Sequence, residues 1–201
     1  MKAFVGPEGV KKAMLAFGEL MSANLDKDAL HTGDDAPEFT LNDVRGGAVS
    51  SKDLLSDSML IVSFIRGSWC PHCVAELRAM QTSLSMMNAV DVNIVVVSPQ
   101  KPDKSIAMMD DNELNCTILY DGDLEVAKKF GVAFQPSQVI TDFIMYILKI
   151  DMYNFYADGG ATLPIPAIFT INMDGKIIYD YVNPNWTERA EPSEYLERFN
   201  S

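Results

Sequence analysis

The sequence predicts an α/β fold in which helices cover both faces of a mixed central sheet, giving a three-layer α/β/α sandwich. Apolar runs with strand propensity alternate with helical patterns through the middle of the chain, which then closes with a hairpin and a helix. The 201 residues, 48% of them hydrophobic, are enough to bury one sizeable core. One main domain is therefore expected.

The N-terminal region predicts an amphipathic helix that precedes this domain. Its apolar residues recur every three or four positions after a loop at Gly6-Pro7, and they are Val10, Ala13, Met14, Phe17, Leu20, Met21 and Leu25. We assign residues 1–32 to this helix and its linker, and residues 33–201 to the α/β domain. The helix is expected to pack on the domain or on a partner.

The first half of the domain predicts a turn-rich entry, a short hairpin and two buried strands with a helix between them. Phe39 and Leu41 alternate with polar neighbours before a turn at Gly46-Gly47, which indicates the hairpin. The strands are almost continuously apolar, as in strands buried on both faces. The entry covers residues 31–37. The strands are expected over residues 59–65 and 92–97, and the helix between them over residues 74–88.

The second half predicts further helices and strands, followed by a C-terminal hairpin. Gly131 is expected to stop a short helix, and the run Asn172 to Gly175 is a strong hairpin signal. Helices are expected over residues 105–114, 124–130 and 192–199, and strands over residues 117–120, 167–171 and 176–181. Residues 138–153 are apolar, aromatic and weakly helical, residues 156–160 form a loop, and the sequence assigns no chemistry to either stretch.

Composition excludes several classes of partner. The formal charge of −12 and the pI near 4.5 would repel nucleic acid and anionic membrane surfaces. The longest apolar runs, residues 59–65 and 143–148, are far shorter than the roughly 20 residues of a membrane span. Residues 1–30 carry charges throughout and do not resemble a secretion signal. We therefore expect a cytoplasmic protein that binds neither nucleic acid nor membrane.

The most specific motif is a C-x-x-C pair, Cys70 and Cys73, between a predicted buried strand and a predicted helix. This placement indicates redox chemistry. At the first helical turn, free N–H groups and the helix dipole favour an anion, so the pKa of Cys70 should fall below about 8.5. Cys73 lies about one turn further on, close enough to form a disulfide with Cys70. In a reducing compartment that bond would form only transiently.

A closed zinc site is the main alternative use of these cysteines. The chain has three cysteines and two histidines, without a second C-x-x-C or an H-x-x-x-H pair. A zinc site would have to recruit Cys116, His31 or His72 from unrelated places. We therefore expect neither a metal nor an organic cofactor.

Three segments of the chain, taken in order, carry a resemblance to known proteins: Ala36-Pro37-Glu38-Phe39 with Leu41, the run from Phe64 to Leu77, and Ile165-Pro166-Ala167-Ile168-Phe169 with Asp174-Gly175. Together they resemble the thioredoxin superfamily and, within it, the alkyl hydroperoxide reductase and thiol-specific antioxidant (AhpC/TSA, peroxiredoxin-like) family. The likeness covers roughly residues 33–199. It implies a thioredoxin-like sandwich, a peroxide or disulfide substrate, and an external dithiol such as thioredoxin as reductant.

The resemblance also implies a special proline next to the thiols. This superfamily places a cis peptide just before the strand opposite the C-x-x-C, and Pro166 occupies that position. Pro164, two residues earlier, is a second proline that we do not assign to it. An X–Pro bond adopts cis at a cost of about 0.5 to 1 kcal/mol. We therefore predict that the Ile165–Pro166 bond is cis.

Two alignments with the family assign opposite roles to the cysteines. The thioredoxin-type alignment makes Cys70 the attacking sulfur and Cys73 the resolving one. The second alignment places the peroxiredoxin pattern P-x-x-x-T-x-x-C-x-x-E over residues 66–76 without gaps. It makes Cys73 the peroxidatic residue and matches Glu76. In this alignment Arg66 replaces the proline of the pattern and Cys70 replaces its threonine. We favour Cys70, because Pro71 is a good first helical residue and Cys70 lies at the helix N-terminus.

Other residues around the motif receive supporting roles. Peroxiredoxins carry a distal arginine, and here Arg66 or Arg189 would have to supply it. His72 is expected to favour the Cys70 thiolate and so make the disulfide more oxidising, or else to be exposed with little effect. Trp69 is expected to cover the thiols, and Arg66 is either a solvated charge or a cation facing substrate. Glu76 either accepts protons near Cys73 or lies on an exposed helix face.

The sequence therefore predicts a peroxiredoxin-like thiol oxidoreductase in which Cys70 attacks and Cys73 resolves. The alternatives are a protein disulfide oxidoreductase without peroxidase activity, and a non-enzymatic redox-sensing module. Cys116 is expected to be buried and inert, with a resolving role as the alternative. The superfamily often pairs, and the apolar segment 139–155 could supply the interface of a homodimer.

Overall fold

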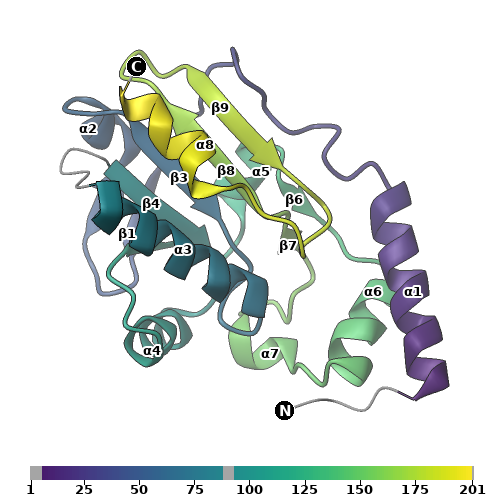
Figure 1. The fold of residues 1–201 in the computed structure, drawn as a ribbon. Helices are drawn as coiled ribbons and strands as arrows, with labels where there is room; N and C mark the ends of the chain where they lie inside the picture. Colours follow the sequence, from purple (N-terminus) through teal and green to yellow (C-terminus); the bar gives the residue numbers. More distant parts are fainter. Residues whose placement is uncertain (1–5, 88–92, 201) are drawn as a thin grey trace.

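A computed structural model describes residues 6–87 and 93–200, and it shows one mixed sheet with helices on both faces (Figure 1). In this described part, seven strands form the sheet in the order β2-β1-β5-β4-β3-β8-β9. In chain order they are β1 (Thr40–Asp43), β2 (Ala48–Ser50), β3 (Leu60–Phe64), β4 (Asn93–Ser98), β5 (Thr117–Tyr120), β8 (Ala167–Ile171) and β9 (Ile177–Val182). The three central strands β3, β4 and β5 are parallel, while β1, β2, β8 and β9 pair antiparallel. The predicted mixed sheet is confirmed.

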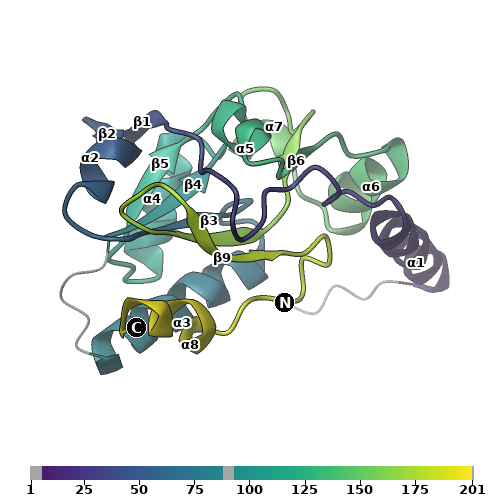
Figure 2. The ribbon, with the colours of Figure 1, turned by 90° about the horizontal axis from the view of Figure 1, so that it is seen from above.

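Helices cover the two faces of this sheet unequally. Apolar side chains of α3 (Pro71–Met87), α4 (Pro102–Asp111) and α8 (Pro192–Leu196) pack on one face. The opposite face is covered by α2 (Ser51–Leu55) and α5 (Glu125–Lys129). Figure 2 shows α3 and α8 on one side of the strands and α5 on the other. Every residue of β3 is buried, so the predicted three-layer sandwich is confirmed.

The glycine-based predictions of turns agree with the structure. Gly46 and Gly47 both adopt positive φ, 102° and 96°, at the turn between β1 and β2. Gly175 has φ 80° between β8 and β9, and Gly131 has φ 70° after α5. L-residues with a side chain rarely adopt these angles, so glycine marked each turn correctly.

The N-terminal helix α1 (Pro7–Ser22) packs away from the sheet. Its buried residues, Ala16 and Leu20, lie against α6 (Gln138–Asp142) and the π-helical turn η1 (Phe143–Ile147). Figures 1 and 2 both show α1 beside α6 at the edge of the molecule. Residues 138–160, which we call the insert, also contain α7 (Met152–Phe155). The stretch to which the sequence assigned no chemistry is therefore the platform for the N-terminal helix.

Some boundaries and elements differ from those expected. Helix α4 starts at Pro102 and ends at Asp111, three residues earlier than predicted, because proline suits the first helical position. Helix α3 starts at Pro71, and α8 ends at Leu196 before a 3₁₀ turn (Glu197–Asn200). The short pair β6 (Ala133–Phe134) and β7 (Leu163–Pro164) flanks the insert and was not predicted, nor was α2. The predicted helix end at Asn88 and strand start at Val92 lie outside the described residues.

The prediction of a cis Ile165–Pro166 bond is wrong, because every described peptide bond is trans. The chain runs from β7 directly into β8 here. Ile165 N–H donates to Val132 O at 2.7 Å, and Pro166 O accepts from Asn183 N–H at 3.3 Å. The trans isomer, which is the lower in energy, satisfies both bonds without a reversal of the chain.

Candidate active site

The loop between β3 and α3 places both cysteines at the start of α3. Gly67 adopts φ 125°, and a β-carbon there would lie 2.4 Å from Gln100 Oε1. That oxygen accepts from the backbone N–H and the hydroxyl of Ser68, each at 2.8 Å. Cys70 N–H donates to Gly67 O, and Cys73 N–H donates to Cys70 O. The loop is therefore tightly fixed, and Cys70 immediately precedes the first helical residue.

Both thiols are free and buried, but they differ in acidity. Cys70 is 2% exposed and Cys73 is fully buried. The hydrogen bond from Cys73 to the Cys70 sulfur, together with the positive charges of Arg66 and Arg189, lowers the pKa of Cys70 against the effect of its burial. The same hydrogen bond, together with burial, raises the pKa of Cys73. Near neutral pH the arrangement favours a thiolate on Cys70 and a thiol on Cys73.

Arg66 supplies the first cation at the thiols. Its Nη2 donates to Cys70 Sγ at 3.2 Å, and the residue is only 3% exposed. Its guanidinium carbon lies 5.0 Å from the ring centroid of Trp69 and 4.6 Å from that of Trp186. Arg66 is therefore not the solvated charge that was one of the two predictions for it.

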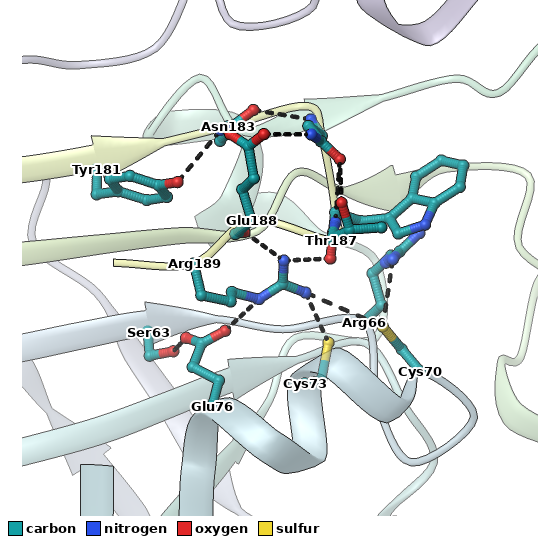
Figure 3. Close-up of polar contacts among 12 residues, drawn as sticks. Ser63, Arg66, Cys70, Cys73, Glu76, Tyr181, Asn183, Thr187, Glu188 and Arg189 are labelled. Atoms are coloured by element: carbon teal, nitrogen blue, oxygen red, sulfur yellow. Dashed lines mark hydrogen bonds and ion pairs between the residues drawn. The ribbon is translucent and has the colours of Figure 1, made fainter. Parts of the chain in front are cut away.

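Arg189 supplies the second cation from the opposite side. Its Nη2 lies 3.7 Å from Cys73 Sγ and 4.0 Å from Cys70 Sγ. Its Nε pairs with Glu76 Oε2 at 2.5 Å. Figure 3 shows this guanidinium between the carboxylate of Glu76 and the sulfur of Cys73. Both arginines that could stand in for the distal arginine of the family therefore reach the thiols.

Glu76 faces the interior and does not lie on an exposed helix face. It is 6% exposed, and its Oε1 accepts from the Ser63 hydroxyl at 3.0 Å. Burial raises the pKa of Glu76 to about 7, although Arg189 and Ser63 both favour the anion. A carboxyl group in this range can hold or release a proton near neutral pH.

A hydrogen-bonded loop after β9 holds Arg189 in place (Figure 3). Glu188 accepts from the side-chain amides of Asn183 and Asn185 at 2.9 and 2.7 Å. Arg189 Nη1 in turn donates to the carbonyls of Trp186 and Glu188. Arg189 was one of two residues predicted to supply the distal arginine, but the sequence did not indicate this network.

Aromatic residues close the site above the thiols. Trp69 Nε1 donates to the Tyr156 hydroxyl at 2.7 Å, and that hydroxyl donates to Arg66 O. A pocket of about 270 Å³ opens beside Cys70, with Pro71 and His72 at its edge. Its apolar walls are Trp69, Phe143, Ile144, Leu148, Ile150 and Trp186. Tyr156, Trp186 and the insert were missed because no short spacing links them to the C-x-x-C motif.

The two other predicted residues, Cys116 and Pro166, lie toward opposite ends of the sheet. Cys116 precedes β5, which runs parallel to β3, so it lies toward the opposite end of the sheet from Cys70. Cys116 is only partly buried, whereas the sequence predicted a buried cysteine, and this burial raises the pKa of its thiol to about 11. The inertness of Cys116 stays a prediction. Pro166 is opposite Ile65 in the continuing β3–β8 register, at the end of β3 from which the loop to Cys70 departs. Within the described ranges, His, Cys, Asp and Glu side chains form no group of three that could hold a metal ion.

Comparisons with known proteins identify a matching family model and similar folds. The family model described as the AhpC/TSA family matches residues 32–180. Peroxiredoxin Bcp of Escherichia coli K12 is 29% identical over 103 residues, which is 51% of this chain and 65% of that relative. The crystal structure of peroxidoxin BcpB from Mycobacterium tuberculosis matches with a TM-score of 0.63 at 20% identity, over 85% of this chain and 95% of that one. A peroxiredoxin-like protein from Aquifex aeolicus matches with a TM-score of 0.64 at 18% identity, over 86% and 87% of the two chains.

Proposed function

The chain belongs to the AhpC/TSA family, and on this basis we propose that it is a thiol-dependent peroxidase-type oxidoreductase whose redox pair is Cys70 and Cys73. The observation that carries the proposal is the convergence of two guanidinium groups, one buried and one partly buried, on two free thiols, one of which has a lowered pKa. Such an environment stabilises a nucleophilic thiolate and the negative charge that develops on a peroxide oxygen.

The proposed reaction has three balanced steps. The Cys70 thiolate attacks a peroxide R–O–OH, the O–O bond breaks, and one proton gives the alcohol ROH and Cys70 sulfenic acid. The Cys73 thiol then attacks the sulfenic sulfur, releasing water and forming the Cys70–Cys73 disulfide. An external dithiol, such as a thioredoxin-type protein, exchanges with that disulfide and restores both thiols while becoming oxidised itself.

Three contacts support Cys70 as the attacking sulfur. Arg66 donates directly to Cys70, the Cys73 thiol donates to it as well, and the apolar pocket opens beside it. Cys73 is fully buried, and its pKa is raised. Glu76 is positioned one helical turn beyond Cys73, and its pKa near 7 suits it to take the proton of the Cys73 thiol and pass it to the hydroxide that leaves the sulfenic sulfur as water.

The peroxiredoxin-type alignment supports the opposite assignment. Arg189 is 3.7 Å from Cys73 and pairs with Glu76, so the cysteine and the glutamate of that pattern come together with an arginine. Under this assignment Cys73 would attack and Cys70 would resolve. The two assignments predict different behaviour for single cysteine variants.

Stopped-flow reaction of the reduced protein with hydrogen peroxide separates them. We expect a fast phase in the wild type that is retained in Cys73→Ser, which should stop at the sulfenic acid, and lost in Cys70→Ser. Loss of the fast phase in Cys73→Ser alone would establish the reverse assignment. Loss in neither variant would refute peroxide reduction by this pair.

A protein disulfide oxidoreductase without peroxidase activity is the second candidate, because a C-x-x-C pair at a helix N-terminus also suits disulfide exchange. Insulin-type disulfide reduction, measured beside peroxide consumption, distinguishes the two activities. A non-enzymatic redox-sensing module would show neither turnover and would retain partner binding when both cysteines are changed to serine.

We also propose a homodimer and a cytosolic site of action. Tyr146 and Tyr153 of the insert are 68% and 65% exposed, and Val139 and Leu148 are 41% and 43% exposed, as an apolar interface would require. Sedimentation at micromolar concentration tests the dimer.

The part of the chain that the structure describes contains no helix long and apolar enough to cross a membrane. A reducing cytosol would keep both thiols ready between turnovers.

A further inference from the structure

The guanidinium of Arg66 is held mainly by aromatic rings. Trp69 and Trp186 both lie within about 5 Å of it, and its Nη2 reaches Cys70 Sγ. Its Nε is buried and has no hydrogen-bond partner in the described part of the chain. Ring faces can orient a guanidinium that hydrogen bonds leave free. The contact between Arg66 and Cys70 therefore depends on what fixes these rings.

Trp186 is fixed by residues from two distant segments. It stacks on Phe143 of the insert, with ring centroids 6.3 Å apart and an interplanar angle of 18°. It also meets Phe17 of α1 edge to face, with centroids 6.1 Å apart and an angle of 88°. Both geometries are favourable for aromatic pairs. An aromatic chain thus runs from the N-terminal helix through Trp186 to Arg66.

Trp69 is held independently of this chain. Its Nε1 is bonded to Tyr156, whose hydroxyl also holds the carbonyl of Arg66. These contacts fix the backbone of Arg66 and the ring of Trp69, but they do not hold Trp186, the other ring that contacts the guanidinium. Trp186 is therefore the element whose loss would free the Arg66 side chain while leaving its backbone in place.

We propose that Trp186 is a positioning residue that holds Arg66 against Cys70 and couples this contact to the docking of the N-terminal helix through Phe17. The inference rests on the proposed function, in which Cys70 is the reactive thiolate. It goes beyond that function because it assigns a role in reactivity to the ring of Trp186 and to α1, which would act on Cys70 through Arg66. Displacement of α1 would then weaken the activation of Cys70.

The test is the pH dependence of alkylation of Cys70 by iodoacetamide in the reduced full chain, followed by mass spectrometry of the modified peptide. We expect Trp186→Ala to raise the apparent pKa of Cys70 by about one unit, because a displaced cation gives up part of a shift of roughly 1 to 3 units. Below that pKa, alkylation then becomes about tenfold slower. Trp186→Phe keeps an aromatic face and should recover most of the wild-type profile.

A double-variant cycle separates positioning from general loosening of the fold. Arg66→Gln alone should raise the apparent pKa at least as much as Trp186→Ala, and adding Trp186→Ala to it should change nothing further. Additive effects, or an unchanged pKa in Trp186→Ala, would overturn the proposal. Phe17→Ala should shift the profile in the same direction by less, whereas Met14→Ala, on an exposed position of the same helix, should not shift it.

These outcomes remain distinct from failure of the proposed function. If Trp186→Ala does not fold, Phe17→Ala still carries the test, and an unshifted profile in that variant would overturn the proposal. Shifted alkylation profiles in a protein that reduces no peroxide would refute the peroxidase activity and leave the positioning role intact. A wild-type Cys70 with an ordinary pKa would refute both.

Discussion

The burial of the Glu76 carboxyl predicts that the free energy of unfolding depends on pH. The substitution is Glu76→Gln, which keeps the size of the side chain and removes its titration. The pKa of Glu76 rises from its ordinary 4.5 to about 7, a difference of about 2.5. At about 1.4 kcal/mol for each unit, the charged form is less stable in the folded protein than in the unfolded chain by about 3 kcal/mol.

The sign follows from which state binds the proton more tightly. Below about pH 4.5 the carboxyl is protonated in both states and its full contribution to stability is present. Between pH 4.5 and 7 the unfolded chain releases the proton while the folded protein retains it, so the free energy of unfolding falls as pH rises. Above about pH 7 the contribution is constant. Glutamine lacks this dependence, and the cost of leaving Arg189 without its carboxylate partner does not change over the same range, since arginine stays charged.

Guanidinium unfolding from pH 4 to pH 8 measures the effect. The Glu76→Gln variant and its parent should both carry Cys70→Ser and Cys73→Ser, so that titration of these thiols does not contribute to the pH dependence of stability. The free energy of unfolding of the glutamine variant, relative to its parent, should rise by about 3 kcal/mol between the two pH values. Glu113→Gln, at an exposed position, serves as the matched control and should show little change. A flat difference for Glu76→Gln would mean that the carboxyl is solvated or is held as an anion throughout, and the argument from burial would be wrong.

Three further predictions concern the cations, the third cysteine and a glycine. Arg66→Met should lower the reduction potential of the Cys70–Cys73 couple by about 30 to 60 mV, since each tenfold loss of thiolate stabilisation is worth about 30 mV. His72→Ala should change that potential less. Equilibration of each variant with a glutathione buffer measures both changes. Cys116→Ser should leave peroxide and disulfide turnover unchanged, because burial holds the pKa of Cys116 at about 11, and loss of turnover would give that cysteine a resolving role. Gly131→Ala should destabilise the protein by more than about 2 kcal/mol in a thermal melt, because the φ of Gly131 is 70° and the new β-carbon would lie 1.8 Å from the Asp28 carbonyl oxygen. Gly46 also has a positive φ but has open space around it, so Gly46→Ala should cost only about 1 kcal/mol.

Local patterns in the sequence predicted the sheet and its turns well. Strand β3 is buried along its whole length, and its run of apolar β-prone residues is the direct cause of that burial. Gly46, Gly47 and Gly175 marked turns because only glycine adopts their backbone angles easily. The cis prediction for Pro166 failed because it came from resemblance alone, while the isomer depends on the hydrogen bonds that the neighbouring segments offer.

The candidate site was only partly predictable, because most of it is assembled from distant segments. Arg66, Trp69 and Glu76 lie within one turn or loop of the cysteines, so local spacing brought them into consideration. Arg189 and Trp186 come from a loop more than a hundred residues away, and helical or strand periodicity does not register such contacts. The role of the insert was hidden for the same reason, since its apolar residues face α1 and Trp186 as well as the core.

The balance of charge explains why this cluster favours a thiolate. Arg66 and Arg189 bring two positive charges into a space from which water is largely excluded, and Glu76 offers one negative charge that is itself raised in pKa. Buried charges are costly unless they are paired, so at least one cation lacks a fixed counter-ion. Ionisation of Cys70 supplies that counter-ion and relieves the cost, whereas closing the disulfide removes it. The same imbalance that activates the sulfur therefore makes the disulfide easier to reduce, which couples the first and last steps of the proposed cycle through Arg66 and Arg189.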